Sequence, residues 1–332
     1  MKVLHLSNGH PTYGGESIYV TNLVRELSQQ IQVECRYFGE DNFTTKNLQQ
    51  FGYLNHQKHQ FQLDKGLNIP LSAMSTCLSF LTDPVDSDIV HCHTWYTLLA
   101  GVMIKRLYNI PLVITVHSME KLRPWKQETL GRGYQLSSWL EEVAFQEADK
   151  LIVPSKQTYQ DMLKFHKTPP EKLRIIWSGV DTDFYQYTNE NAVLLKYGID
   201  IKRPYVLFFG RTTKQKGIEN MLAAIPYIDP TTQIVFCMGK HDHASYLKEI
   251  ESKINLLQKQ HSIIWLKNDW FEPEEIVQLF SHASVYCCPS IYETFGLVAV
   301  EAMACGTPVV ATDIGGLNET IAHRKTGFLA PF

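Results

Sequence analysis

The chain has 332 residues, more than one hydrophobic core usually holds, so we expect two domains of roughly 150–180 residues each. Its 44% hydrophobic and 20% charged residues and its formal net charge of -3 fit a soluble α/β enzyme, and they exclude recognition of nucleic acid or of an anionic membrane through bulk charge. No apolar run reaches the length of a membrane span, no leader pattern opens the chain, and seven scattered cysteines suit a reducing compartment, so we expect a cytoplasmic protein.

In the first half of the chain, short apolar runs alternate with longer helical patterns. The expected strands are residues 1–7, 88–91, 112–116 and 150–153, and the expected helices are residues 16–29 and 136–148. This alternation is typical of parallel strands whose connecting helices cover both faces of a sheet. We therefore predict a doubly wound α/β domain over residues 1–185.

Two glycines, Gly14 and Gly15, stand between the first expected strand and the first expected helix. Without side chains, they would let backbone N–H groups approach an anion at the start of that helix. A tight strand-to-helix turn explains them equally well. The pattern is neither the G-x-G-x-x-G fingerprint nor a Walker loop, so it argues against a nicotinamide dehydrogenase and against a P-loop NTPase.

Three histidines lie near the ends of strands in the first half. His91 and His93 are two residues apart and share one face of a strand, and His117 follows the next strand. A metal site at His91 and His93 needs a third ligand, which the sequence does not supply at motif spacing, so we expect no bound metal. His117 could hydrogen-bond a substrate, and a structural role is an equal alternative.

The second half of the chain repeats the alternation of strands and helices. A polar turn and a charged stretch between Gly179 and Pro204 mark a domain boundary, which we place after residue 185. The expected strands are then residues 205–209, 233–238, 263–266, 284–288 and 308–311, and the expected helices are residues 218–225, 273–282 and 296–304. Residues 186–332 are thus predicted to form a second doubly wound α/β domain.

A basic loop containing Arg211 and Lys216 follows a strand and precedes a helix in this second half. Such a loop lies at the carboxyl edge of a parallel sheet, where ligands bind in open α/β folds. A guanidinium fork and a compact ammonium can together neutralise a diphosphate. A solvated loop is the usual alternative for clustered charges, but the position of this loop favours an anion-binding role.

The most specific motif, residues 292–308, holds two glutamates eight residues apart. Glu293 stands before an expected helix, and Glu301 lies about two turns along it. Backbone N–H groups of residues 295–297 would point toward an anion at the start of the helix, and a carboxylate accepts hydrogen bonds from two neighbouring sugar hydroxyls. A favourable contact with the helix dipole would explain a single glutamate at the start of a helix. The whole motif, residues 292–308, instead favours a sugar-binding site.

These motifs resemble the retaining GT-B glycosyltransferases of family 4, with Glu293 and Glu301 as the E-x7-E pattern. The segments most similar to the bacterial glycogen synthase and α-maltose-1-phosphate synthase branch are residues 91–96, 115–126, 133–139 and 288–293. The resemblance runs from residue 1 almost to residue 332. It implies two Rossmann-like domains that face each other across a cleft, the first on the acceptor side and the second binding the donor. Family members continue beyond the residues that match 327–332, so the resemblance also implies a truncated second domain.

The activity implied by the resemblance is transfer of glucose from ADP-glucose or UDP-glucose, with retention of the α configuration. The acceptor would be an α-1,4-glucan or glucose 1-phosphate, as in glycogen biosynthesis. The implied donor site consists of Gly14, Gly15, Arg211, Lys216, Glu293, Thr294, Phe295, Gly296, Leu297 and Glu301, and the implied catalytic residues are His117, Arg211, Lys216 and Glu293. No nucleophile and no obligatory metal or other cofactor are expected.

Each implied residue has a role in this comparison. Arg211 and Lys216 would bind the donor diphosphate and stabilise the leaving nucleotide. Glu301 would hold the ribose hydroxyls, and Glu293 would contact the donor sugar. His117 matches the histidine beside the donor glucose. The glycine loop, residues 14–19, departs from the branch, which tends to have small residues there and a histidine near the position of Tyr19.

Two alternatives to a glucan-forming enzyme stay open. One is a family 4 transferase that makes a different product, such as a cell-surface polysaccharide, a glycolipid or a sucrose-type sugar. The absence of a basic amphipathic stripe argues against a lipid acceptor. The other is a non-enzymatic protein that only binds a nucleotide sugar, since a fold does not fix a function. The intact Arg211, Lys216, Glu293, Glu301 and His117 favour an enzyme.

Overall fold

The computed structural model describes residues 1–9, 15–54, 65–239, 241 and 243–331. The chain divides into two compact units, Met1–Trp177 and Ser178–Phe332. We predicted the boundary after residue 185, and the compact units divide a few residues earlier. Phe184 and Tyr185 pack against the hydrophobic core of the second unit, so the segment that precedes the expected boundary belongs to that unit.

The first unit is built on an eight-stranded sheet with the strand order β3-β4-β2-β1-β5-β6-β7-β8. Its strands are β1 (Lys2–Ser7), β2 (Gln32–Tyr37), β3 (Asn42–Thr44), β4 (Leu48–Gly52), β5 (Ile89–His93), β6 (Leu112–Thr115), β7 (Lys150–Val153) and β8 (Leu173–Ile175). All neighbours are parallel except β3 and β4. The strand order reverses between β1 and β5, and this switch point is where ligands bind in doubly wound sheets.

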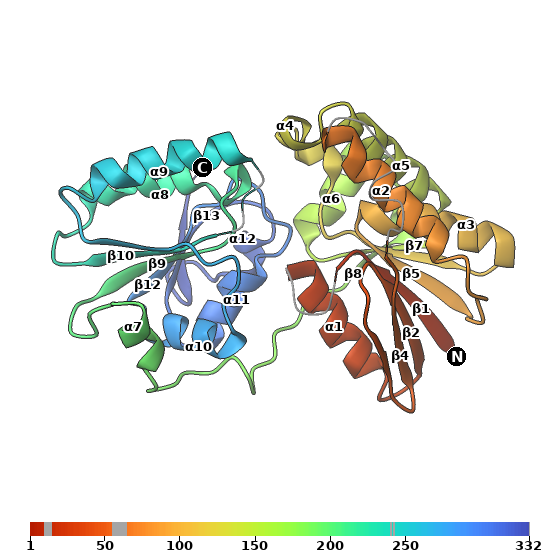
Figure 1. Ribbon diagram of the computed structural model, residues 1–332, viewed down its shortest axis with the longest axis horizontal. Coiled ribbons are helices and arrows are strands. Elements are labelled where there is room, and N and C mark those ends of the chain that lie inside the picture. Colours follow the sequence, from red (N-terminus) through yellow and green to blue (C-terminus); the bar gives the residue numbers. More distant parts are fainter. Residues whose placement is uncertain (10–14, 55–64, 240, 242, 332) are drawn as a thin grey trace. The chain divides into compact units, whose positions relative to one another are not determined.

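Helices cover both faces of this sheet (Figure 1). They are α1 (Gly15–Leu27), α2 (Lys65–Ser79), α3 (Leu98–Tyr108), α4 (Lys126–Leu130), α5 (Gly133–Glu147) and α6 (Lys156–Phe165). On one face, Val20 and Val24 of α1 pack against Val33 and Cys35 of β2. On the other face, α2, α3 and α5 pack against the alternate residues of β1 and β5. Side chains of a strand alternate between faces, so His5, in register with Cys35, lies on the α1 face.

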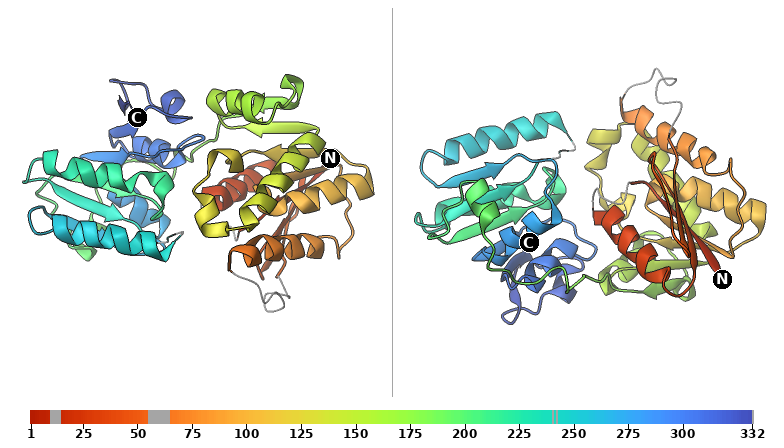
Figure 2. Two further views of the ribbon diagram at one scale, coloured as in Figure 1. Left: turned by 90° about the horizontal axis from the view of Figure 1, so that it is seen from above. Right: turned by 60° about the horizontal axis from the view of Figure 1, so that its bottom comes forward.

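The second unit contains a six-stranded, all-parallel sheet with the order β11-β10-β9-β12-β13-β14. Its strands are β9 (Tyr205–Phe209), β10 (Gln233–Cys237), β11 (Ile263–Leu266), β12 (Val285–Cys288), β13 (Val309–Thr312) and β14 (Gly327–Ala330), and its helices are α7 (Ala192–Lys196), α8 (Ile218–Ala224), α9 (Ala244–Leu257), α10 (Pro273–Ser281), α11 (Leu297–Ala304) and α12 (Leu317–Thr320). Helices α8 and α9 cover one face, and α7, α10 and α11 cover the other (Figure 2). The switch point of this sheet lies between β9 and β12.

The predicted fold class, two doubly wound α/β domains, is confirmed. The strand expected at residues 263–266 has the bounds of β11, and the other expected elements agree within a few residues. The sequence analysis did not assign β2, α2, α3 or α9. Among the residues that the structure describes, no helix is both long enough and apolar enough to cross a membrane.

Candidate functional site

The basic loop of the second unit begins where β9 ends, at the switch point of the sheet. Its last residue, Gly217, has φ +63°, a left-handed conformation that favours glycine. A Cβ at this position would lie 1.8 Å from the carbonyl oxygen of Pro289. The backbone N–H of Ile291 donates to the carbonyl of Gln215 at 2.9 Å. The loop after β9 therefore packs directly on the loop after β12, and a glycine makes this approach possible.

This packing brings Lys216 and Glu293 together although they are 77 residues apart. Lys216 Nζ lies 2.5 Å from Glu293 Oε1, and only 17% and 11% of the two side chains are exposed. Burial by itself would lower the pKa of Lys216, but the Glu293 carboxylate outweighs this effect, so the pKa lies above its usual value. Ser290 also donates its hydroxyl hydrogen to Glu293 Oε1, at 3.1 Å. Lys216 is therefore a buried, permanently charged ammonium at the sheet edge.

Arg211 adds a second positive charge to this place. Its guanidinium is close enough to Lys216 to oppose the rise in the lysine pKa. Two cations next to each other at the carboxyl edge of a parallel sheet are matched to a ligand with two negative charges. The sequence-predicted pair of cations is thus assembled by the fold.

Glu301 lies on α11 and is largely buried, in contact with Tyr185. Burial raises the pKa of Glu301 to about 7, while the hydrogen bond with Tyr185 and the charge of Lys216 act in the opposite direction. Burial, and then the Glu301 charge, raise the pKa of the Tyr185 phenol. Sequence analysis missed Tyr185, because nothing in the sequence indicates that the segment before α7 returns to α11.

The predicted loop at the start of α11 is supported by two further glycines. Gly315 has φ +51°, and a Cβ there would lie 1.8 Å from the carbonyl oxygen of Glu293. The backbone N–H of Gly316 donates to that same carbonyl at 3.0 Å. Gly296 precedes α11 with φ +89°. The Gly315–Gly316 turn, which the sequence analysis did not single out, holds the backbone of residues 293–296 in place.

In the first unit, the structure describes one of the two glycines that are predicted to bind the donor. Gly14 lies outside the described residues, and Gly15 is the first residue of the helix. His117 follows β6, and the edge of the Tyr19 ring meets the His117 ring at a centroid distance of 4.9 Å. Tyr19, which belongs to the segment that departs from the glycogen synthase branch, is therefore in contact with the histidine predicted to lie beside the donor glucose.

The structure supplies the third histidine that the sequence analysis lacked. His5 of β1 is in register with His91 of β5, and one nitrogen each of His5, His91 and His93 lie within 4.8 Å of one another. We predicted no third ligand because His5 is far from His91 in the sequence and only strand pairing brings the two together. Among the described residues, His5, His91 and His93 are the group of side chains whose arrangement could hold a metal ion.

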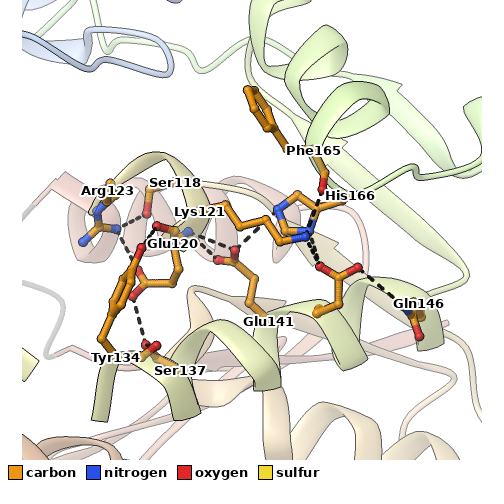
Figure 3. A network of polar contacts seen from close by, with 11 residues as sticks. Ser118, Glu120, Lys121, Arg123, Tyr134, Ser137, Glu141, Gln146, Phe165 and His166 are labelled. Carbon is orange, nitrogen blue, oxygen red and sulfur yellow. Dashed lines mark hydrogen bonds and ion pairs between the residues drawn. The ribbon is translucent and has the colours of Figure 1, made fainter. Parts of the chain in front are cut away.

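The loop after β6 is fixed to α5 by a buried polar network (Figure 3). The backbone N–H of Glu120 donates to both carboxylate oxygens of Glu141, at 2.9 and 3.1 Å, and Ser137 donates to Glu120 at 3.0 Å. Burial, followed by the charge of Glu120, raises the pKa of Glu141 well above its usual value. Arg123 forms an ion pair with Glu120 at 3.4 Å. These residues belong to segments 115–126 and 133–139, which carry part of the family resemblance. We conclude that the network anchors the loop that contains His117.

Family models match both units of the chain. Residues 13–184 match the model described as Glycosyltransferase Family 4, and residues 193–332 match Glycosyl transferases group 1. The chain is 35% identical to α-maltose-1-phosphate synthase of Mycolicibacterium smegmatis, over 100% of this chain and 85% of that protein. It is 27% identical to D-inositol 3-phosphate glycosyltransferase of Corynebacterium aurimucosum, over 95% of this chain and 79% of that protein.

Solved structures share the fold over the whole chain. Sucrose-phosphate synthase from Thermosynechococcus elongatus is similar with a TM-score of 0.82 and 22% identity, covering 100% of this chain and 86% of that one. Anabaena HepE in complex with UDP-glucose is similar with a TM-score of 0.77 and 20% identity, covering 100% and 85%.

Proposed function

The chain belongs to glycosyltransferase family 4 and has the GT-B fold, and from this premise we propose that it transfers glucose from ADP-glucose or UDP-glucose, with retention of the α configuration, to glucose 1-phosphate or an α-1,4-glucan. The observation that carries the proposal is the cluster of Arg211, Lys216 and Glu293 at the switch point of the second sheet. Full-length similarity to an α-maltose-1-phosphate synthase supports the choice of glucose donor and acceptor.

Arg211 and Lys216 are proposed to bind the donor diphosphate. When the bond between the anomeric carbon and the phosphate oxygen breaks, negative charge grows on the leaving nucleotide. Two fixed cations stabilise this charge more strongly in the transition state than in the ground state, which is the condition for a rise in kcat. A buried lysine with a raised pKa keeps its charge throughout the physiological pH range.

The remaining donor contacts are assigned from the same cluster. Glu293 would accept hydrogen bonds from the glucose hydroxyls, with the backbone of residues 294–297 beside it, and Glu301 would accept them from the ribose. Gly14, Gly15 and His117 of the first unit are proposed to contact the donor phosphates and glucose. The two glutamates have different partners here, so their spacing is not that of a glycosidase acid–base pair.

A phosphorylated acceptor is favoured over a glucan. The two relatives described above are named for maltose 1-phosphate and for D-inositol 3-phosphate, each of which carries a phosphate on a small molecule. We therefore place glucose 1-phosphate ahead of the glucan as acceptor. A glycolipid, a surface polysaccharide and a sucrose-type sugar are the other candidate products.

The proposal is tested by following nucleoside diphosphate release with the full chain. ADP-, UDP- and GDP-glucose are each combined with glucose 1-phosphate, a maltooligosaccharide, inositol 3-phosphate or fructose 6-phosphate. We expect fast release only with ADP- or UDP-glucose and with glucose 1-phosphate or the maltooligosaccharide. Fast release with another acceptor alone would replace the proposed acceptor, and release with none would leave a protein that only binds nucleotide sugars.

We predict that chelators leave this transfer reaction intact. Arg211 and Lys216 supply the positive charge that Mg²⁺ provides in other nucleotide-dependent enzymes. The two Asp-x-Asp pairs of the sequence, Asp86/Asp88 and Asp181/Asp183, both lie outside the loop that carries these two cations. The rate in excess EDTA should stay within about twofold of the untreated rate. A loss of activity in EDTA that Mg²⁺ or Mn²⁺ restores would contradict this assignment of the two cations.

The raised pKa of Glu301 predicts that donor affinity depends on pH. Ribose hydroxyls bind the ionised carboxylate, whereas burial keeps Glu301 protonated below about pH 7. Donor binding must then release a proton, so affinity for UDP-glucose should fall roughly tenfold per pH unit well below pH 7 and level off above it. Calorimetry between pH 5.5 and 8.5 measures this, because the phosphates of UDP-glucose do not titrate in that range. The slope should vanish in Glu301→Gln, and an equal slope in that variant would refute the role of Glu301.

A further inference from the structure

Three histidines of the first unit form a continuous chain of ring nitrogens at the switch point between β1 and β5. His5 Nδ1 lies 3.2 Å from His93 Nε2, and His93 Nδ1 lies 3.1 Å from His117 Nε2. We call His5, His93 and His117 the histidine chain. A fourth ring, His91, lies beside it, but its Nε2 pairs with the hydroxyl of Thr115 at 2.8 Å. The histidine chain therefore links the middle of β1 to the loop that follows β6.

The rings of the histidine chain are uncharged at neutral pH. His5 and His93 are fully buried beneath α1. Burial lowers the pKa of His5 and of His117 to about 4, and it lowers the pKa of His93, with contributions from the neighbouring histidines, well below its usual value. A neutral imidazole has one N–H donor and one acceptor nitrogen. Each contact in the histidine chain must therefore join a donor on one ring to an acceptor on the next.

The buried end of the chain determines the direction of these hydrogen bonds. His5 Nε2 is buried and has no hydrogen-bond partner among the described residues. A buried N–H without an acceptor is more costly than a bare acceptor nitrogen, so the proton of His5 belongs on Nδ1, where it is donated to His93 Nε2. His93 then carries its own proton on Nδ1 and donates it to His117 Nε2. His117 in turn must carry its proton on Nδ1.

We propose that His5 and His93 are positioning residues that fix His117 in the Nδ1–H tautomer, so that His117 acts only as a donor through Nδ1. The inference rests on the proposed function for the role of His117 toward the donor sugar. The assignment of the tautomer does not depend on that function, because it follows from the ring contacts and from the buried, unpartnered Nε2 of His5. A hydroxyl oxygen of the donor sugar is the matching acceptor for such a donor.

The backbone next to the histidine chain is strained in a way that fits this role. Thr94, directly after His93, has φ 63° and ψ 160°, a conformation that β-branched residues rarely adopt. Its hydroxyl donates to Asn8 Oδ1 at 3.3 Å, beyond the end of β1. Strain of this kind persists where the surroundings hold a residue in place, and here it lies at the switch point of the sheet, where ligands bind.

Metal coordination explains the arrangement of these histidine rings less well than hydrogen bonding does. Nitrogen ligands about 2.0–2.1 Å from a tetrahedral zinc ion lie roughly 3.3 Å from one another. The nitrogens of His5, His91 and His93 lie within 4.8 Å of one another, which is a looser grouping. The nitrogens of His5 and His93 also face each other at hydrogen-bond distance. The geometry therefore favours a hydrogen-bonded chain, and zinc becomes one outcome of the test.

The test is nitrogen NMR of the full chain labelled with ¹⁵N-histidine at pH 7.5, which distinguishes the two neutral tautomers of each ring. We expect His5, His93 and His117 in the Nδ1–H form. In His93→Leu, His117 loses its donor and should revert to the Nε2–H form, whereas His93→Asn keeps a donor near the position of Nδ1 and should preserve the tautomer. His93→Met serves if His93→Leu does not fold, because its more adaptable side chain removes the same donor. His91→Gln, adjacent but outside the chain, is the matched control and should leave His117 unchanged.

Kinetics then connect the tautomer to transfer. We expect kcat to fall roughly 10- to 100-fold in His93→Leu with little change in the acceptor KM, and His93→Asn to restore most of it. A wild-type His117 in the Nε2–H form, or an unchanged His117 tautomer in the folded His93→Leu or His93→Met variant, would overturn the proposal. Stoichiometric zinc whose removal shifts the ¹⁵N signals of these rings would overturn it too. A chain with the expected tautomers but no glucose transfer would instead refute the proposed function.

Discussion

Replacing Lys216 with alanine is expected to lower kcat by roughly 100- to 1,000-fold, the effect that follows the loss of one transition-state donor in a preorganised site. Lys216 carries a buried, permanent charge beside the proposed position of the diphosphate, and Arg211 lies next to it. Arg211→Ala should have an effect of the same order. Because the charge of the leaving nucleotide grows as the sugar bond breaks, kcat should fall more than the donor affinity.

Two variants separate this effect from general damage to the loop. Lys214→Ala removes the same charge two residues away, from a side chain whose charge acts on Glu249 of α9, and it should keep kcat within a fewfold of wild type. Lys216→Ala also leaves Glu293 buried without its cation, which destabilises the fold. The double variant Lys216→Met and Glu293→Gln removes that unpaired charge, so it should recover stability but not activity. A normal rate in Lys216→Ala would refute the donor site.

Gly217→Ala is expected to separate the two loops that form the candidate site. A Cβ at Gly217 would lie 1.8 Å from the carbonyl oxygen of Pro289, in a backbone conformation with φ +63°. The collision involves backbone on both sides, so the loop after β9 must shift. We expect the free energy of unfolding to fall by about 3 kcal/mol or more, and donor affinity to fall at least tenfold, since Lys216 precedes the glycine directly.

Gly198→Ala is the matched control for this prediction. Gly198 has φ +69°, but a Cβ there would meet no atom within 4 Å. It therefore reports only the cost of the left-handed backbone, about 1 kcal/mol. Chemical denaturation of both variants and calorimetry with UDP-glucose measure the difference. Equal losses of stability, with donor binding retained in Gly217→Ala, would show that the close approach of the two loops does not form the site.

Most of the second unit could be predicted from local pattern. Its central strands are short, continuous apolar runs such as residues 205–209, as buried parallel strands require. Helix α2 was harder to recognise because Pro70 lies inside it, and proline is usually a sign that a helix ends. Helix α9 carried a usable signal that was missed: its buried residues Tyr246, Ile250 and Ile254 recur every four positions.

The candidate site could be predicted only as separate pieces. Each motif showed its own chemistry, but the ion pair between Lys216 and Glu293 depends on how two strands of one sheet are ordered. The same reason explains why His5 was not connected with His91, because a neighbour in a sheet is set by register rather than by spacing along the chain. Tyr185 is far from Glu301 in the sequence, so no local pattern could place the two side chains together.

The central claim is transfer of glucose with retention, and proton NMR of the reaction product tests it most directly. The full chain is incubated with UDP-glucose or ADP-glucose and glucose 1-phosphate, and the new anomeric signal is followed together with nucleoside diphosphate release. We predict an α-linked disaccharide phosphate that forms in step with the nucleotide in wild type and Lys214→Ala but not in Lys216→Ala. A β-linked product, or nucleotide release that no acceptor accelerates and that Lys216→Ala does not slow, would contradict the account.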